Sequence, residues 1–260
     1  MQKKKNILTF LSLANYVADT IAIELLKYYK LKNTKLLKKK VEHQIVTDLD
    51  YKIEEIARKL IKSVYPDHNI IGEELKSINK KSNFTWIIDP IDGTKAFVSG
   101  IPVFTFLLSL KYKNNYVLGL VDQPILKERY WNLDNKAYLN GTQIKVSKYK
   151  SLPNSIIAIT DPLMFNNYDL LNKKIFNKLN FIRWGTDALG YMRCAEGIID
   201  GVIERNIKVW DIAAIIPILE ASGGVITTWD NKTPGTNDTI LACNNIKLHK
   251  ILVNTLQKYI

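Results

Sequence analysis

Two aspartates, Asp89 and Asp92, directly follow the apolar run Trp86-Ile-Ile88 and are separated by Pro90 and Ile91. Two carboxylates at this spacing, at the end of a strand and in a turn that proline stiffens, can share one divalent cation or hold two neighbouring ones. The carbonyl of Ile91 is expected to face the same space as a further oxygen ligand. Because Asp-Gly pairs form ordinary turns in many proteins, an acidic turn without chemistry is an equal alternative on spacing alone.

Gly93 and Thr94 shift this balance toward phosphate chemistry. A glycine after paired carboxylates lets backbone N–H groups approach an anion closely, and the Thr94 hydroxyl is placed to orient a water. The sequence therefore indicates a cation and an anion at the same turn.

Three more acidic residues occupy distant positions that suit the same site. Glu73 follows the apolar pair Ile70-Ile71, Asp211 follows Trp210 at the start of a predicted helix, and Asp50 completes a Thr-x-x-Asp pattern at the start of another. For Asp211 and Asp50, a purely structural role in capping a helix is the alternative.

Four segments together form a signature: Gly72-Glu-Glu74, Trp86-Ile-Ile-Asp-Pro-Ile-Asp-Gly-Thr94, Trp210-Asp-Ile-Ala-Ala214 and Ala221-Ser-Gly-Gly224. On these motifs the chain resembles the inositol monophosphatase superfamily of metal-dependent, lithium-sensitive phosphatases along nearly its whole length. The resemblance implies a phosphomonoesterase that uses in-line attack of a water activated by the metal.

The resemblance also implies roles for individual residues. The metal-binding set, for two or three Mg²⁺ ions, consists of Glu73, Asp89, the carbonyl of Ile91, Asp92 and Asp211. The catalytic set consists of Asp50, Thr94 and Glu73, with Thr94 and Asp50 orienting and deprotonating the water. The substrate-binding set consists of Asp92, Gly93, Thr94, Asp187 and Glu204, with the amides of Gly93 and Thr94 at the phosphate.

This assembly has a consequence for stability. Four carboxylates in one pocket cannot all stay ionised without cations, because like charges raise one another's pKa. The metal-free protein is therefore expected to be less stable than the Mg²⁺ form.

Substrate choice depends on other segments, and several look like the histidinol-phosphatase branch of the superfamily: residues 95–102, 119–124, 128–131, 185–187 with Tyr191, and 217–220. By that resemblance Asp187 and Glu204 face the leaving alcohol, where carboxylates suit a cationic amine or imidazole and also suit sugar hydroxyls. Histidinol phosphate is the expected substrate.

Alternatives to this substrate stay open. Thr186 is the usual residue of inositol-type members, so inositol 1-phosphate or a broad range of sugar phosphates comes next, followed by a 3′-phosphonucleotide. At the residue level, Asp187 can also be an N-cap of the following helix, and Glu204 can form a surface ion pair near Arg205.

The net charge of +12 is also compatible with a different kind of function, that of a non-catalytic nucleic-acid-associated protein on the same fold. Lysines are dense only at residues 35–40, without interleaved aromatic residues, which favours a solvated helix end or attraction of a small anionic substrate. Because every metal-binding position of the signature is intact, nucleic acid is an unlikely partner and catalysis is expected.

The elements that must position these residues divide the chain near residue 147. In residues 1–147, apolar residues at helical spacing predict a first helix around residues 11–25 and a second from Asp48 to Val64. Short β-like runs at residues 86–88, 104–112, 116–122 and 128–132 then predict a mostly antiparallel sheet.

Residues 148–260 alternate strands and helices instead, which predicts a tightly packed α/β half that completes the site. Strands are expected at 155–160, 181–184, 201–204 and 225–229, and helices at 163–179, 188–196 and 212–222, the last kinked by Pro217. The resemblance implies a mixed α/β fold, a layered α-β-α-β-α sandwich of the sugar-phosphatase type.

Composition bounds the remaining expectations. An apolar fraction of 47% excludes a disordered chain, and no run of about eighteen uninterrupted apolar residues predicts a membrane span. The first segment reads as an amphipathic helix rather than a signal peptide. Two cysteines, Cys194 and Cys243, in no metal-type spacing indicate a reducing compartment, so a cytoplasmic protein is expected. Homodimers are common in the superfamily, and a homodimer is expected here.

Overall fold

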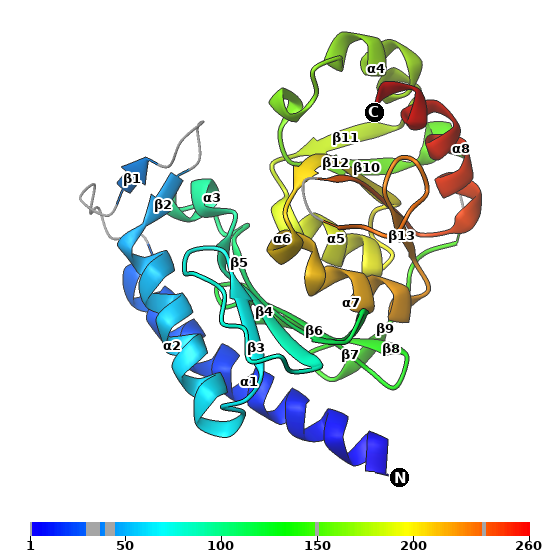
Figure 1. Cartoon of the computed structure of the whole chain (residues 1–260). Coiled ribbons are helices and arrows are strands. Elements are labelled where there is room, and N and C mark those ends of the chain that lie inside the picture. Colours follow the sequence, from blue (N-terminus) through cyan, green and yellow to red (C-terminus); the bar gives the residue numbers. More distant parts are fainter. Residues whose placement is uncertain (1, 30–36, 40–44, 149–150, 236–237) are drawn as a thin grey trace.

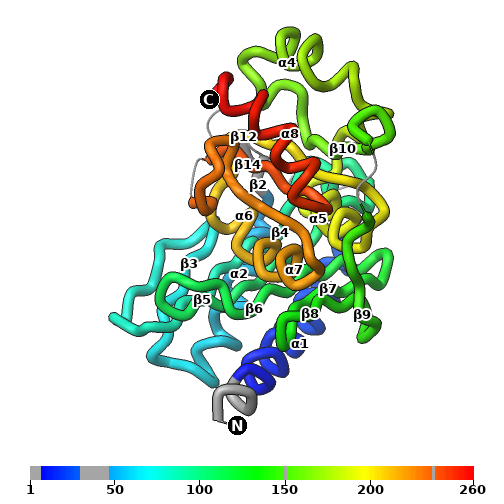
Figure 2. The backbone as a smooth tube through the Cα atoms, turned by 90° about the vertical axis from the view of Figure 1, so that its right-hand side faces the viewer, coloured from blue at the N-terminus to red at the C-terminus, as the bar shows by residue number. Residues whose placement is uncertain are grey.

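The computed structural model describes residues 2–29, 37–39, 45–148, 151–235 and 238–260. Two β-sheets alternate with three layers of helices (Figure 1). Figure 2 shows the same stack from the side, with α1 against one sheet and α8 at the far end of the molecule. The predicted α-β-α-β-α sandwich is confirmed.

The first helical layer consists of α1 (Gln2–Tyr28) and α2 (Asp48–Val64). Between them in the chain, the short strands β1 (Leu37–Lys39) and β2 (Ile45–Thr47) form a small antiparallel sheet of their own. The stripe predicted for α1 is buried, since Ala14, Val17, Ala18, Ile21 and Leu25 are each 0% exposed. By length and composition residues 7–28 could cross a membrane, the one such stretch in the described part of the chain. Its stripe packs into the core beneath the first sheet, so this helix is a core helix here.

The first sheet follows in chain order: β3 (Asn69–Gly72), β4 (Phe84–Asp92), β5 (Thr105–Tyr112), β6 (Asn115–Gln123), β7 (Glu128–Leu133), β8 (Lys136–Leu139) and β9 (Thr142–Ile144). Only β3 and β4 pair in parallel, so the predicted antiparallel sheet is confirmed. The three shortest of these strands, β3, β8 and β9, were not predicted because they carry too few residues for a period of two to show.

The middle layer contains α5 (Asp187–Ala195), α6 (Val209–Ala213) and α7 (Ile215–Ser222) between the sheets. One kinked helix was predicted over 212–222, and the chain instead breaks at Ala214 into α6 and α7. Pro217 has no N–H to donate to the carbonyl of Ala213, four residues earlier. That carbonyl accepts from Ser109 Oγ of β5 at 2.9 Å, which ties the break to the first sheet.

The second sheet has the order β11-β10-β12-β14-β13. Its strands are β10 (Ile156–Ile159), β11 (Phe181–Trp184), β12 (Gly201–Ile207), β13 (Val225–Thr227) and β14 (Asp238–Cys243). β10 pairs in parallel with β11 and β12, whereas the pairs with β14 are antiparallel. The sheet is thus mixed.

The outer layer contains α4 (Tyr168–Lys174) and α8 (Ile246–Leu256). The single helix predicted over 163–179 is wrong: η3 (Pro162–Met164), α4 and η4 (Phe176–Lys178) replace it. Asn166 and Asn167 have low helix propensity, and the breaks let Phe165 reach Phe176, with ring centroids 5.7 Å apart.

The predicted division at residue 147 falls between β9 and β10. Across it, Leu107 and Val121 of the first sheet share one core cluster with Leu189 of α5 and Ile215 of α7. Each half would expose part of this cluster if it folded alone, so mutual dependence of the halves stays a prediction with a physical basis.

Candidate active site

A β-bulge at the end of β4 brings the two signature aspartates to one pocket. In the pairing with β5, Asp89 lies opposite Leu107 and Asp92 lies opposite Thr105, so β4 carries one extra residue between these pairs. Residues three apart on a regular strand point to opposite faces, and the extra residue turns both carboxylates to the same side. The turn predicted at Pro90 is therefore a bulge within the strand.

The pocket lies between the two halves of the chain. The first half contributes Glu73, Asp89, Ile91, Asp92, Gly93, Thr94 and Lys95. The second half contributes Thr160, Met164, Asp187, Ala188, Tyr191, Glu204, Asn206, Ile207 and Asp211. Every residue predicted for the site lines the pocket except Asp50, which lies behind it.

Asp50 reaches the pocket through Thr94. Its carboxylate accepts the Thr47 N–H at 2.8 Å and the Thr47 hydroxyl at 2.5 Å, which forms the predicted capping box of α2. The other oxygen, Oδ1, lies 3.4 Å from Thr94 Oγ1, while that hydroxyl donates to the carbonyl of Ile91 at 2.9 Å. The capping role and a contact to the site therefore coexist in one side chain.

Gly93 begins the short helix α3 (Thr94–Val98) in a left-handed conformation, with φ +76°. A Cβ at this position would lie 3.2 Å from the Asp187 carboxyl group and 3.3 Å from Phe104 Cα. Glycine is needed here both for its backbone angle and for the close approach of the two halves.

Asp92 joins the halves directly. Its Oδ2 accepts the Ala188 N–H at 2.8 Å, near the start of α5, and lies 3.3 Å from the Thr105 hydroxyl. Asp211 lies in the first turn of α6 and accepts the Lys208 N–H at 2.8 Å. The N-cap of α6 is Lys208, so the alternative reading of Asp211 as an N-cap is wrong; its carboxylate closes the first turn from the third helical position and also lines the pocket.

Burial and mutual repulsion make this group of carboxylates hard to ionise. Burial raises the pKa of Asp89 well above the usual range, and the charge of Glu73 raises it further. Burial raises the pKa of Asp92 in the same way, and there the charge of Asp187 adds to the shift. Burial likewise raises the pKa of Asp50 and of Asp211 to about 6. The protein alone does not supply the positive charge that these residues require.

The same residues fit a hard divalent cation. Asp89 is 2% exposed, and its Oδ1 has no hydrogen-bond partner among the described residues, which is costly for a buried oxygen unless a cation or water completes it. The surrounding donors are carboxylate and carbonyl oxygens, the ligand type of Mg²⁺. In the described part of the chain, no group of three or more His, Cys, Asp or Glu side chains is placed so that it could hold a metal ion without rearrangement. Glu73, Asp89, the Ile91 carbonyl, Asp92 and Asp211 would hold the ion.

The opposite wall of the pocket carries a second acidic pair. Glu204 is 3% exposed and accepts hydrogen bonds from the hydroxyls of Thr160 and Tyr191, the latter at 2.6 Å. Burial raises the pKa of Glu204 to about 7. The surface ion pair considered for Glu204 is therefore wrong.

Asp187 is the first residue of α5, and the N-cap of this helix is Thr186. The N-cap reading is wrong. Asp187 instead adopts φ +44°, a strained conformation for a residue with a side chain, and its N–H donates to Thr160 Oγ1 at 3.1 Å. Burial raises the pKa of Asp187 to about 6, which the charge of Lys95 partly offsets.

Thr160, Met164 and Asn206 line the pocket and were not predicted. Thr160 follows β10, and side chains at the carboxyl ends of strands often face a ligand, so the predicted strand over 155–160 held a usable signal. Asn206 lies in a register irregularity of β12 with φ +62°, which no local pattern indicated.

The sequence model of the inositol monophosphatase family matches residues 8–260. The chain belongs to the inositol monophosphatase family. This is a family of generally metal-dependent phosphatases, so the predicted family and the phosphatase class are confirmed.

Relatives within the family bear different names. The fructose-1,6-bisphosphatase/inositol-1-monophosphatase of Aquifex aeolicus is 32% identical and covers 86% of each chain. The histidinol-phosphatase of Chlorobaculum parvum is 29% identical and covers 82% of this chain and 83% of its own. The structure of the extragenic suppressor protein suhB from Bartonella henselae superposes with a TM-score of 0.88 at 26% identity, over 96% of this chain and 99% of that one.

Proposed function

We propose that this family member is a Mg²⁺-dependent phosphomonoesterase. The observation that carries the proposal is the buried, unpartnered Oδ1 of Asp89 among oxygen ligands, next to the Thr94 hydroxyl and the left-handed Gly93. This arrangement provides a cation site and a phosphate site side by side.

The chain's own residues divide the work of hydrolysis. Bound Mg²⁺ would lower the pKa of a coordinated water and stabilise the charge of the leaving oxygen. Thr94 orients the attacking water, and Asp50 receives the proton through the Thr94 hydroxyl, 3.4 Å from Oδ1. The amides of Gly93 and Thr94 would hold the phosphate, while Glu73, Asp89, the Ile91 carbonyl, Asp92 and Asp211 would hold the cation, through which Asp92 also contributes to substrate binding.

Histidinol phosphate is the proposed substrate. Asp187 and Glu204 bring two further carboxylates to the pocket that contains the proposed phosphate site, and the leaving alcohol of histidinol phosphate carries an amine and an imidazole that carboxylates attract. The histidinol-phosphatase relative supports this choice.

Inositol 1-phosphate or sugar phosphates form the second candidate, because the same carboxylates accept hydrogen bonds from hydroxyls and the Aquifex relative is named for such substrates. A comparison of kcat/KM for histidinol phosphate, inositol 1-phosphate and 3′-phosphoadenosine 5′-phosphate, each with Mg²⁺, separates the candidates. A preference for either of the latter two esters would overturn the histidinol assignment but not the phosphatase.

A binding protein without turnover is the competing class, and the name of the Bartonella structure, an extragenic suppressor protein, is not that of an enzyme. No phosphate release from any of the three esters, together with salt-sensitive binding of RNA or DNA, would favour that class over catalysis.

Finer properties belong to the same proposal: two or three Mg²⁺ ions per site, inhibition by lithium, a homodimer and a cytoplasmic location. The two cysteines, Cys194 and Cys243, are buried thiols, which agrees with a reducing compartment. Lithium titration of turnover and sedimentation of the purified protein test the inhibition and the dimer directly.

A further inference from the structure

Helix α2 carries a buried ion pair that the proposed chemistry does not use. Glu54 and Arg58 are one helical turn apart, with side chains 0% and 7% exposed, and Arg58 Nε donates to Glu54 Oε1 at 2.7 Å. A buried ion pair contributes little net stability by itself, because desolvation offsets the attraction. Its other contacts therefore indicate its role.

Those contacts all go to the segment that follows β3. Glu54 accepts the N–H groups of Glu74 at 2.7 Å and Leu75 at 3.3 Å. Arg58 donates to the carbonyls of Leu75 and Lys76, both at 2.9 Å. The ion pair therefore hydrogen-bonds both the N–H and the C=O groups of the backbone immediately after Glu73.

The backbone before Glu73 is fixed as well. Ile70 and Ile78 exchange two backbone hydrogen bonds, of 2.9 and 2.8 Å, and close the segment into a loop. A Cβ on Gly72 would lie 2.0 Å from Glu54 Oε1, so the chain passes against the carboxylate at a point where only glycine fits. Glu73 lies between two backbone positions that both touch Glu54.

The same helix holds Asp50, one turn before Glu54. Residues four apart lie on one face of a helix, so a single face of α2 presents Asp50, Glu54 and Arg58. We infer that Glu54 and Arg58 are positioning residues that set Glu73, relative to Asp50, in the geometry that Mg²⁺ binding requires. The inference rests on the proposed function, since it assigns Glu73 to the metal.

The test measures Mg²⁺ binding to the whole protein without substrate, by the thermal shift as Mg²⁺ is added after chelation. Glu54→Gln keeps the shape but places an amide donor against backbone N–H groups, and Arg58→Lys keeps the charge but loses the forked contact to two carbonyls. Both should raise the Mg²⁺ midpoint about 10-fold or more, as residues that support metal ligands do. At saturating Mg²⁺, kcat should return to within about threefold of the wild type.

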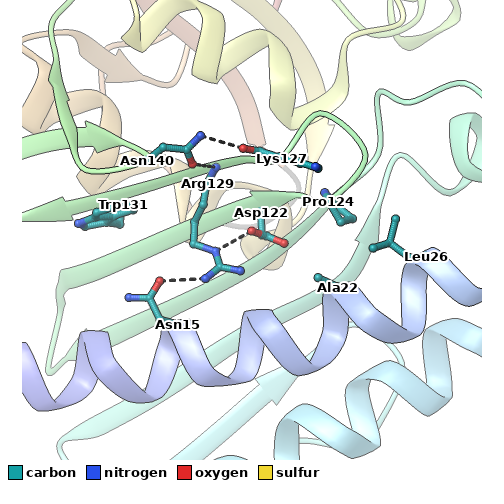
Figure 3. Close-up of a pocket in the computed structure, with 9 residues that line it drawn as sticks. All are labelled: Asn15, Ala22, Leu26, Asp122, Pro124, Lys127, Arg129, Trp131 and Asn140. Atoms are coloured by element: carbon teal, nitrogen blue, oxygen red, sulfur yellow. Dashed lines mark hydrogen bonds and ion pairs between the residues drawn. The ribbon is translucent and has the colours of Figure 1, made fainter.

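Arg129→Lys is the matched control (Figure 3). Arg129 forms a comparable ion pair with Asp122, at 2.6 Å, beneath α1 and away from the Glu73 loop. This variant should lower the melting temperature and leave the Mg²⁺ midpoint unchanged.

If Glu54→Gln fails to fold, Arg58→Lys alone tests the positioning role. A wild type that responds to Mg²⁺, with Arg58→Lys responding at the same midpoint, would overturn the positioning role and leave the phosphatase proposal standing. A wild type without any response to Mg²⁺ would overturn the metal site itself, and this inference with it.

Discussion

The two walls of the pocket are built differently. On the metal side, Asp89 and Asp92 come from one bulged strand, four residues that are contiguous in the sequence. On the alcohol side, Asp187 begins α5 and Glu204 belongs to β12, and the hydroxyl of Thr160 contacts both. The two central aspartates of the metal side are local in sequence, although Glu73 and Asp211 join them from distant segments, whereas the alcohol side exists only after the second sheet has formed.

The two walls also differ in how many of their carboxylate oxygens have hydrogen-bond partners within the protein. Both oxygens of Glu204 accept a hydrogen bond from a protein hydroxyl, whereas Asp89 keeps a buried oxygen without a partner. The alcohol side is therefore preorganised by the protein, and the metal side is incomplete until a cation binds. The difference suggests that the first wall determines the reaction and the second determines the substrate.

Asp89→Asn is the change with the largest expected effect. It removes a charge from the incomplete wall, and kcat/KM should fall by about 10³-fold or more for every ester, since loss of one preorganised electrostatic contact can already cost 10²–10³-fold. The Mg²⁺-dependent rise in melting temperature should disappear, while the chelated protein should be at least as stable as the wild type, because one buried carboxylate has been replaced by a neutral amide. Steady-state kinetics and thermal melts measure both.

Asp169→Asn, at an exposed position of α4, is the control and should change neither quantity. Nearly intact turnover in Asp89→Asn would remove the distinction between the two walls.

Removal of Mg²⁺ should destabilise the protein, and more so at higher pH. In the metal-free protein the pKa of Asp50 and of Asp211 is raised to about 6. For acids with a raised pKa, stability is full below the unfolded-state value near 3.8 and is lost as the pH rises through about 6. Mg²⁺ should offset that loss because it binds ionised Asp211 and lowers the repulsion that Asp50 meets from the pocket.

The rise in melting temperature with Mg²⁺ should therefore grow from pH 5 to pH 8. A concentration of 100 times Kd stabilises by about 2.7 kcal/mol, or roughly 5–10 °C for a protein of this size. Calorimetry at both pH values, with and without chelator, measures the difference. An equal rise at both values would show that these carboxylates do not take part.

The contrast between the walls also explains how much the sequence predicted. Asp89 and Asp92 were proposed from the residues themselves, because their motif is contiguous and carboxylates suit a cation, whereas Glu73 and Asp211 were implied as ligands by the family resemblance, and all four roles stay predictions. The bulge was not, since it depends on the pairing of Asp89 with Leu107, which no local pattern encodes. Asp187 and Glu204 came from the family resemblance, and their alternative readings were rejected only by burial and contacts in the folded chain.

The elements show the same limit. Helix α2 was predicted to the residue because Thr47 and Asp50 form a capping box and the apolar stripe has a clear period. The sequence predicted a kink at Pro217, whereas the helix breaks at Ala214. No local pattern shows this, because the freed carbonyl of Ala213 accepts its hydrogen bond from Ser109 in the first sheet. Long-range partners decide what local propensity leaves open.

Glu204→Gln should alter selectivity rather than chemistry. Losing the carboxylate charge removes a charge-assisted contact to a cationic alcohol, so kcat/KM for histidinol phosphate should fall about 10-fold, and that for inositol 1-phosphate by less than about threefold. The Mg²⁺ midpoint should not move. An equal loss for both esters, or a shifted midpoint, would mean that Glu204 serves the metal side instead.

Tyr191→Phe should have the smallest effect. It deletes the hydroxyl that donates to Glu204 at 2.6 Å but keeps the buried ring, and the Thr160 hydroxyl still holds the other carboxylate oxygen. One lost hydrogen bond of about 1 kcal/mol predicts a decrease of roughly fivefold in kcat/KM for the preferred ester, with the order of substrates preserved. In the Glu204→Gln background the same change should add little, because both act on one contact. Independent, multiplying effects in the double variant would show that Tyr191 contacts the substrate itself.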